Sequence, residues 1–221
     1  MKHVVLALLA VVAPMMAHAD LASNAATYQK LFNNPPDAAT ISKSKMNTGE
    51  TRPKAVLKGV FYFGGSDVKR KNLSSGFQDV LCKAGFSQAY SVYTPVNTVA
   101  TCSGNRVQYD QIGEAKLASD GGSKVAALMR QIYDIVKSDG GKGPIYLHCY
   151  YGVHASSTIA QMVLKQFCGI SDAQALANWK KVNLYNSLDA AGVAKQQAKI
   201  KGYQVDRSLQ LTAAEQATIC Y

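Results

Sequence analysis

The sequence has few of the residues that build metal sites, redox motifs or membrane spans. It has four histidines, of which His3 and His18 lie near the amino terminus, and it has no Cys-x-x-Cys pair. A metal site or another cofactor is therefore not predicted. Beyond the first 16 residues no apolar run of membrane length occurs. A zinc-finger or helix-turn-helix pattern and a long basic run are also missing, which argues against nucleic acid as the partner.

The first 19 residues have the pattern of a secretory signal peptide. A short basic start precedes an apolar run from Val4 to Met16, and Ala17-His18-Ala19 is a small-x-small cleavage site. The apolar run is short for a stable anchor, although an uncleaved anchor is the alternative. We expect cleavage to leave residues 20–221 as an exported bacterial protein, periplasmic or secreted, without membrane attachment.

Acidic residues are scarce, because 14 Asp and Glu stand against 24 Lys and Arg, for a formal net charge of +10. The basic residues occur singly or in short groups such as Lys69-Arg70-Lys71 and Lys180-Lys181. A positive field favours a polyanionic ligand, such as a multiply phosphorylated small molecule. A basic surface that serves only solubility is equally consistent with this composition.

The chain has five cysteines, at positions 82, 102, 149, 168 and 220. Setting Cys149 aside leaves four, which in an oxidising compartment permits two disulfides with three connectivities. The pairing Cys82–Cys102 with Cys168–Cys220 is favoured. The alternative is that Cys82 and Cys168, at apolar helical positions, are small buried hydrophobic residues.

Hydrophobic periodicity predicts strands that alternate with helices in the middle of the chain and helices at its end. Strands are predicted at residues 56–63, 86–93, 97–101, 106–112 and 145–149. Helices are predicted after Ser74 or Ser75, after Ser123, from near Ser156, after Ser171, at residues 188–201 and after Thr212. This order indicates one α/β domain over residues 55–221, with a central mixed sheet of about four or five strands covered by helices on both faces. Residues 20–54 are expected to form an irregular arm.

The stretch from Gly143 to Thr158 carries the prediction of function. A turn leads into the apolar run Ile145–Leu147, a His-Cys pair follows, and a glycine-containing loop then enters a helix that starts near Ser156. The N–H groups of such a loop and the helix dipole point at one spot and make an anion site. A thiol at that spot is stabilised as a thiolate.

This stretch resembles the phosphate-binding loop of the cysteine-dependent protein tyrosine phosphatase superfamily. The pattern there is His-Cys, two residues, Gly, two residues, Arg, then Ser or Thr. His148, Cys149, Gly152 and Ser156 match it, whereas Ala155 stands at the arginine position. The resemblance covers roughly residues 55–185 and implies a single-domain fold of the dual-specificity type.

Within the superfamily the chain looks most similar to bacterial secreted enzymes that act on inositol polyphosphates, the phytases. The export signal, the basic charge and the helical tail fit that group. Gly121, however, stands where the group often has a histidine.

The resemblance implies that Cys149 attacks phosphorus and forms a cysteinyl-phosphate, with no cofactor. Ser156 would then offer a hydroxyl to the sulfur. The residues that would surround the phosphate are His148, Tyr150, Tyr151, Gly152, Val153, His154 and Ala155. The alternatives are an inert buried thiol at Cys149, a core histidine at His148 and a plain helix N-cap at Ser156.

A general acid must protonate the leaving oxygen. The resemblance implies an Asp on a mobile loop before the cysteine, just ahead of a helix. Asp120 fits this place best, because it lies 29 residues before Cys149 in a glycine-flanked loop just ahead of the Ser123 helix. Glu114 is the second candidate. Asp110 is the third, but it sits inside a strand pattern.

Ala155 decides how much activity can be expected, because a methyl group cannot donate hydrogen bonds to two phosphate oxygens as an arginine guanidinium does. Loss of an arginine that serves phosphoryl transfer costs about 10³- to 10⁵-fold in rate. Two hypotheses follow: an impaired or inactive phosphatase for a soluble phosphomonoester such as phytate, or a catalytically dead relative that binds phosphorylated ligands. The first hypothesis fits an altered sequence, in which alanine has replaced an arginine that the parent sequence carried at position 155. A redox thiol protein is a third reading, against which the lack of a Cys-x-x-Cys partner argues.

Overall fold

The structure, a computed structural model, describes residues 21, 25, 54–68, 71–113, 123–182 and 188–221. These residues form a mixed six-stranded sheet of order β1-β2-β6-β3-β5-β4. The strands are β1 Lys54–Leu57, β2 Phe61–Gly65, β3 Gln88–Ser91, β4 Asn97–Cys102, β5 Asn105–Gln111 and β6 Ile145–Cys149. The four inner strands run parallel, and the outer strands β1 and β4 are antiparallel to their neighbours. The predicted signal peptide and nearly all of the predicted arm lie outside the described residues.

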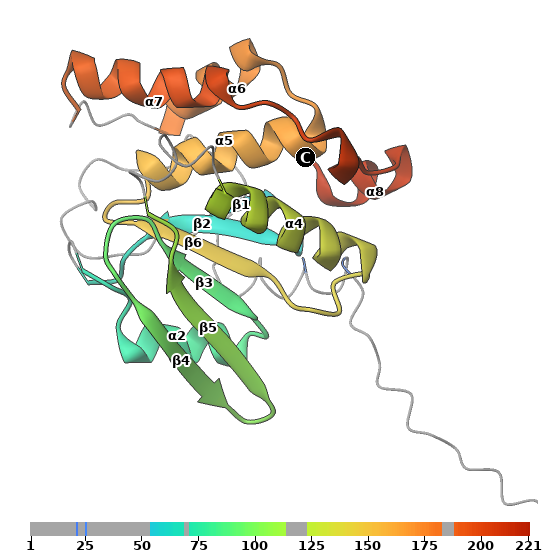
Figure 1. Cartoon of the computed structure of the whole chain (residues 1–221). Helices are drawn as coiled ribbons and strands as arrows, with labels where there is room; N and C mark the ends of the chain where they lie inside the picture. The colour runs from blue at the N-terminus through green and yellow to red at the C-terminus, as the bar shows by residue number, and fades with distance from the viewer. Residues whose placement is uncertain (1–20, 22–24, 26–53, 69–70, 114–122, 183–187) are drawn as a thin grey trace, which may run out of the picture.

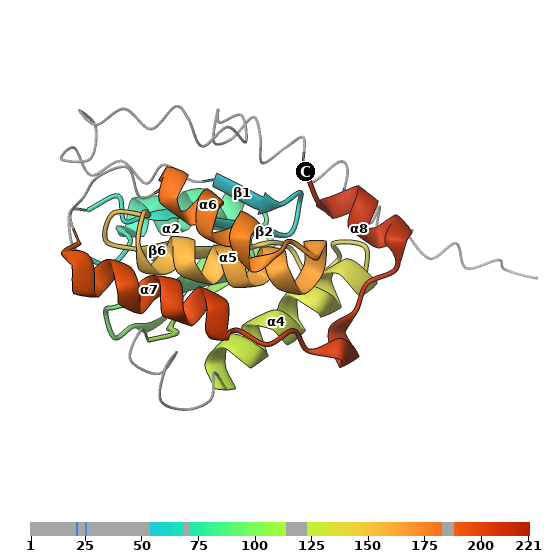
Figure 2. The same ribbon diagram turned by 90° about the horizontal axis from the view of Figure 1, so that it is seen from above.

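Helices cover both faces of the sheet, as the sequence predicts for the α/β class (Figure 1). They are α2 Ser75–Lys83, α4 Ser123–Lys137, α5 Ala155–Cys168, α6 Asp172–Val182, α7 Ala190–Gly202 and α8 Ala213–Ile219, with a 3₁₀ turn at Arg207–Leu209. Helix α2 packs on one face, and α4 and α5 pack on the other. Figure 2 shows α6 and α7 on either side of α5, where they form an outer layer.

The sheet has six strands rather than four or five because the predicted strand 56–63 is a hairpin. Gly59 has φ +71°, a left-handed conformation that glycine adopts readily, and it reverses the chain between β1 and β2. A Cβ at this glycine would lie 2.6 Å from the carbonyl oxygen of Leu21, so the turn is also packed closely. Apolar residues lie on both sides of the Lys58-Gly59 pair and fit the pattern of one strand, which hid the turn from the periodicity argument.

Successive residues of β6 point to opposite faces of the sheet, and this alternation separates the two key side chains. Leu147 and Cys149 belong to the core that α4 and α5 cover. Tyr146 packs in the core under α2, and the ring of His148 stacks on it with centroids 6.4 Å apart. The thiol therefore faces the helix that follows the loop, and the imidazole faces the opposite layer.

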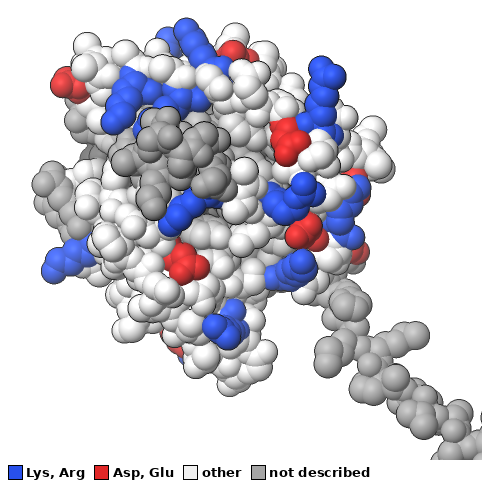
Figure 3. Space-filling view, in the orientation of Figure 1, with Lys and Arg blue, Asp and Glu red and all other residues white. Residues whose placement is uncertain are grey.

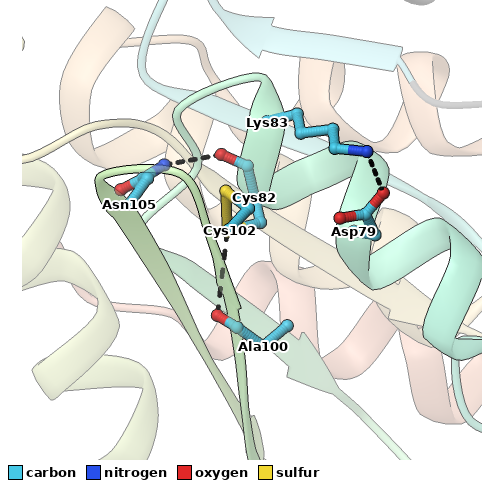
Figure 4. The surroundings of a disulfide bond; sticks show 6 residues. All are labelled: Asp79, Cys82, Lys83, Ala100, Cys102 and Asn105. Carbon is cyan, nitrogen blue, oxygen red and sulfur yellow. Dashed lines mark hydrogen bonds and ion pairs between the residues drawn. A yellow bond between two sulfur atoms is a disulfide. The ribbon is translucent and has the colours of Figure 1, made fainter.

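The disulfides are those that the sequence analysis favours. Cys82–Cys102 joins α2 to β4, and Cys168–Cys220 joins α5 to the end of the chain. Figure 4 shows the first bridge, where the Asn105 side-chain amide donates to the Cys82 carbonyl oxygen at 2.6 Å. The alternative of two unbridged buried cysteines is wrong. All five cysteines lie in the described residues, and Cys149 is the free one.

The helix starts predicted after Ser171 and Thr212 are confirmed, and each is a capping box. Thr212 and Glu215 cap each other at the start of α8, and Ser171 and Gln174 do so at the start of α6. Ser74 caps α2 by accepting the Phe77 N–H. Within the part of the chain that the structure describes, no helix has the length and hydropathy that a membrane crossing requires.

Candidate active site

The sulfur of Cys149 lies at the carboxyl end of β6, buried beneath the loop that follows the strand. The Gly152 N–H donates to it at 3.2 Å, and the Ser156 hydroxyl lies 3.1 Å away. The same hydroxyl is 3.3 Å from the Gly64 carbonyl oxygen. A thiol can therefore donate to a hydroxyl that donates onward to this carbonyl. Conversely, a negatively charged sulfur can receive both the hydroxyl and the amide proton.

Gly152 allows the loop to lie against the end of β2. Its φ is +70°, and a Cβ there would come within 2.4 Å of the Gly64 carbonyl carbon and the Gly65 nitrogen. The loop is held on this strand by a bridge between Gly65 and Tyr151 and by the Ser66 N–H, which donates to the Tyr150 carbonyl oxygen at 3.4 Å. The close contact between two backbones fixes the direction of the Gly152 N–H toward the sulfur.

Helix α5 starts directly after the loop, with His154 at its N-cap position and Ala155 as its first residue. The His154 side chain makes no capping hydrogen bond. The first-turn N–H groups of a helix have no intrahelical partners and carry partial positive charge. The helix begins one residue before Ser156, so the N-cap alternative for Ser156 is wrong. Its hydroxyl turns instead to the sulfur and to Gly64.

His148 is a neutral imidazole, and each of its two ring nitrogens makes a hydrogen bond. Burial lowers its pKa to about 4. Its Nδ1 lies 3.3 Å from the Cys149 carbonyl oxygen, which can only accept, so Nδ1 carries the proton. Its Nε2 then accepts from the hydroxyl of Tyr109 at 2.6 Å. The histidine thus links the backbone of the nucleophile to the layer under α2.

Tyr109 completes this buried chain, and the sequence analysis missed it. Its hydroxyl accepts the Leu73 N–H at 3.1 Å, and burial raises its pKa to about 12. The residue lies in β5, with its side chain in the core. Its sequence signal is only the apolar alternation of a strand, which does not reveal the polar contact across two strands.

The low pKa of His148 predicts a pH-dependent stability. The unfolded chain binds a proton near pH 6.5, whereas the folded protein binds it only near pH 4. The unfolded state therefore binds more protons in this window, and the free energy of unfolding should fall by about 3 kcal/mol as pH drops from 6.5 to 4. Urea unfolding at several pH values would measure the slope.

The matched variant is His148→Asn, whose amide keeps a donor near the Cys149 carbonyl but does not titrate. The pH slope of the variant should be shallower than that of the chain with His148, and carboxylate contributions should be common to both. Parallel curves for the two proteins would contradict the assignment.

Ala155 is fully buried and belongs to the core beneath α5. It offers neither a positive charge nor an N–H donor from its side chain to an anion in the loop. The loop therefore presents backbone donors and a hydroxyl, with a methyl group where the family pattern has a guanidinium.

The remaining predicted residues are distributed around the loop. Val153 and His154 are buried, and the ring of Tyr150 lies 4.8 Å from that of Tyr93. Asp120 and Glu114, the candidate acids, lie outside the described residues. Asp110 lies in β5, where Gln88 and Gln108 donate to its carboxylate at 3.1 and 3.0 Å. Among the residues that the structure describes, no group of three histidines, cysteines or carboxylates is placed to hold a metal ion.

Comparison of the sequence with protein families and with curated proteins gives no match. Several solved structures are similar in fold. Tk-PTP in its active form has a TM-score of 0.45 at 14% identity, with 67% of this chain and 95% of that chain covered. TpbA from P. aeruginosa has a TM-score of 0.47 at 16% identity, with 70% and 88% covered. The core catalytic domain of the PP-IP phosphatase SIW14 from S. cerevisiae has a TM-score of 0.42 at 13% identity, with 72% and 91% covered.

Proposed function

We propose that the loop from Cys149 to Ser156 binds a phosphomonoester and that Cys149 is the nucleophile of a cysteine-dependent phosphatase reaction. The observation that carries the proposal is the environment of the sulfur. The only free cysteine of the chain receives a backbone N–H and lies against a hydroxyl, at the start of a 14-residue helix. The donors that would hold a phosphate oxygen are also those that stabilise negative charge on the sulfur.

The proposed reaction has two displacements at phosphorus. Cys149 forms the S–P bond while the P–O bond to the alcohol breaks, and Asp120 gives its proton to the leaving oxygen. Water then attacks the cysteinyl-phosphate and releases inorganic phosphate and the sulfur anion. The Ser156 hydroxyl, 3.1 Å from the sulfur, can donate to that anion as it departs.

Ala155 sets the expected rate. Without a bidentate arginine, backbone N–H groups alone stabilise the charge on the equatorial oxygens of the transition state. The rate should therefore be about 10³- to 10⁵-fold below that of a loop with arginine. The buried methyl group equally favours the second candidate function, a protein that binds phosphorylated ligands without turnover.

A soluble polyanion, such as an inositol polyphosphate, is the proposed ligand in both cases. The formal net charge of +10 supports it through long-range attraction. Figure 3 shows lysines and arginines spread over one face of the molecule, with carboxylates between several of them. This distribution favours attraction of a polyanion from a distance rather than one extended basic patch.

The test measures two properties of the complete protein: its turnover of phosphomonoesters and the protection of Cys149 from alkylation by a bound ligand. Hydrolysis of p-nitrophenyl phosphate and phytate is measured for the chain with Ala155 and for Cys149→Ser, and iodoacetamide alkylation of Cys149 is measured with and without phytate. Slow turnover that Cys149→Ser abolishes supports the phosphatase. Protection without turnover supports the binding protein, and the absence of both refutes the proposal.

Export is part of the proposal. Two disulfides support it, because such bridges persist in oxidising compartments. The expected first residue of protein recovered from a periplasmic or culture fraction is Asp20. Amino-terminal sequencing checks this, and an intact Met1 in a membrane fraction would indicate an anchor instead.

A further inference from the structure

Strand β4 forms one edge of the sheet, and among the described residues no strand pairs with its outer side. Figure 1 shows the β4–β5 hairpin at the lower margin of the molecule, away from helices α5 to α8. Most of β4 is exposed, and the side chain of Val99 is 43% exposed. An open edge of this kind is a template for pairing with another strand.

Proteins usually protect such an edge with charges, proline or bulges, and β4 has none of these. Its sequence, Asn-Thr-Val-Ala-Thr-Cys, contains no charged residue and no proline. Its register with β5 runs without a bulge from Asn97 to Cys102. The opposite edge strand, β1, begins with Lys54 and has a break in register between Ala55 and Leu57. The outer side of β4 is therefore the unprotected edge of the sheet.

The directions of the free backbone groups follow from the ladder between β4 and β5. The Gln111 N–H donates to the Val96 carbonyl oxygen at 3.1 Å. In an antiparallel ladder every second residue bonds to the same neighbouring strand. The even-numbered residues of β4 therefore bond to β5, whereas Asn97, Val99 and Thr101 direct their N–H and C=O groups outward. Each of these three residues offers one donor and one acceptor at the edge.

We propose that β4 pairs antiparallel with the β4 of a second copy of this chain, in a register centred on Val99. In this register Val99 lies opposite the partner's Val99, and Asn97 lies opposite the partner's Thr101. All outward N–H and C=O groups of the three residues then bond across the interface. A register centred on any other residue leaves some of these groups unpaired. The pairing also brings two exposed valine side chains together, and cross-strand pairs of this kind stabilise sheets.

The charges beside the edge match in the same register. On the face of the sheet that carries Val99, Asn97 pairs with Asp110 and Thr101 pairs with Arg106. A row across the two copies therefore starts at Asp110, passes Asn97 and the partner's Thr101, and ends at the partner's Arg106. Each row thus has one carboxylate and one guanidinium, and Figure 3 shows few other charged side chains over this hairpin.

Pairing joins the two sheets around a two-fold axis perpendicular to them. The Cys82–Cys102 bridges then lie roughly 20 Å apart at opposite ends of the paired strands, so the two copies of α2 are offset along the strands. Strands β5 and β3 separate β4 from β6, so the Cys149 loop stays open in both copies. Pairing is independent of the phosphatase chemistry, and Cys149→Ser should associate as the chain with Cys149 does.

The expected association is weak, because pairing of one strand buries less than the roughly 1,200 Å² of a stable interface. We expect a dissociation constant on the order of 100 µM. The net charge of +10 on each copy opposes association. At about 0.15 M salt the Debye length is about 8 Å, so most of this repulsion is screened. Sedimentation equilibrium at this salt, from about 20 µM to 1 mM protein, measures the constant.

Amide hydrogen exchange, followed by NMR, identifies the edge without any variant. The outward N–H groups of Asn97, Val99 and Thr101 should exchange about fourfold more slowly at about 1 mM than at about 20 µM, by mass action at the expected constant. The N–H groups of Thr98 and Ala100 are bonded to β5 at both concentrations. Their exchange should not change, and they serve as the internal control.

Variants separate the backbone from the side chain. Val99→Pro removes one outward N–H and no bond to β5, and proline is tolerated at an edge position whose N–H faces solvent. It should weaken association about tenfold or more, whereas Val99→Thr keeps the N–H and the β-branch and should change it less than about threefold. Arg106→Glu should weaken association about twofold to threefold, although it lowers the net charge. Thermal unfolding confirms that each variant folds.

Three results would overturn the proposal. The first is no association up to about 1 mM protein. The second is association that leaves the exchange of the outward amides unchanged, which would place the contact on another surface. The third is an equal loss in Val99→Pro and Val99→Thr, which would indicate a side-chain contact without strand pairing.

Discussion

Ala155→Arg is expected to raise phosphomonoesterase activity by about 10³- to 10⁵-fold, equivalent to roughly 4–7 kcal/mol of transition-state stabilisation. Residue 155 is the first residue of α5, directly after the loop that surrounds the Cys149 sulfur. The sulfur has its two donors, and the loop amides are fixed against β2. Among the described residues of the loop, the planar, bidentate cation of the family pattern is the missing part. The measurement is kcat/KM for p-nitrophenyl phosphate and for phytate.

The burial of Ala155 sets a condition on this result. Because the methyl group is in the core, an arginine side chain must extend outward over the loop, and thermal unfolding must show that the variant still folds. Ala155→Lys is the matched control, since it adds a charge without the fork and should recover much less activity.

Further variants test the roles of the sulfur and the acid in the arginine background. Adding Cys149→Ser should abolish the gain, because the thiolate nucleophile is lost. Adding Asp120→Asn should lower the rate, and more for alkyl than for aryl esters, since a poorer leaving group depends more on the acid. A folded Ala155→Arg protein without activity would contradict the phosphatase proposal and favour the binding protein.

Gly152→Ala should disrupt the site and destabilise the fold. The left-handed backbone conformation costs an alanine about 1–2 kcal/mol. The added Cβ would also lie within 2.4 Å of the backbone of Gly64 and Gly65, which cannot shift without disturbing the pairing of β2 with β6. We expect the free energy of unfolding to drop by about 4 kcal/mol or more, together with loss of the N–H···S contact. Urea unfolding measures the stability, and the rate of Cys149 alkylation reports on the contact.

Gly104→Ala is the matched control for this prediction. Gly104 also has a positive φ, +77°, but a Cβ there would meet no atom within 4 Å. Its replacement should therefore cost only the backbone term of about 1–2 kcal/mol. Similar losses at both glycines would mean that the close approach of the loop to β2 has little importance for stability.

The sequence predicted features that depend on neighbours along the chain. Alternating strands and helices indicated the α/β class, and Ser74 and Thr212 marked helix starts, because capping is a contact within one turn. The order strand, Cys149, glycine loop and helix likewise placed the sulfur at a helix start. The hairpin at Gly59 escaped prediction, because the apolar residues on both sides of Lys58-Gly59 fit the pattern of a single strand.

By itself the sequence thus determined the α/β class, since hydrophobic periodicity follows from neighbours along the chain, and the resemblance of the loop to the phosphatase pattern singled out Cys149 and Gly152. Only the tertiary structure decided that Tyr109 supports His148 across the sheet and that Ala155 is buried. These contacts join residues from separate strands and helices. Their distances depend on strand order, register and helix packing, which a linear pattern of residues does not encode locally.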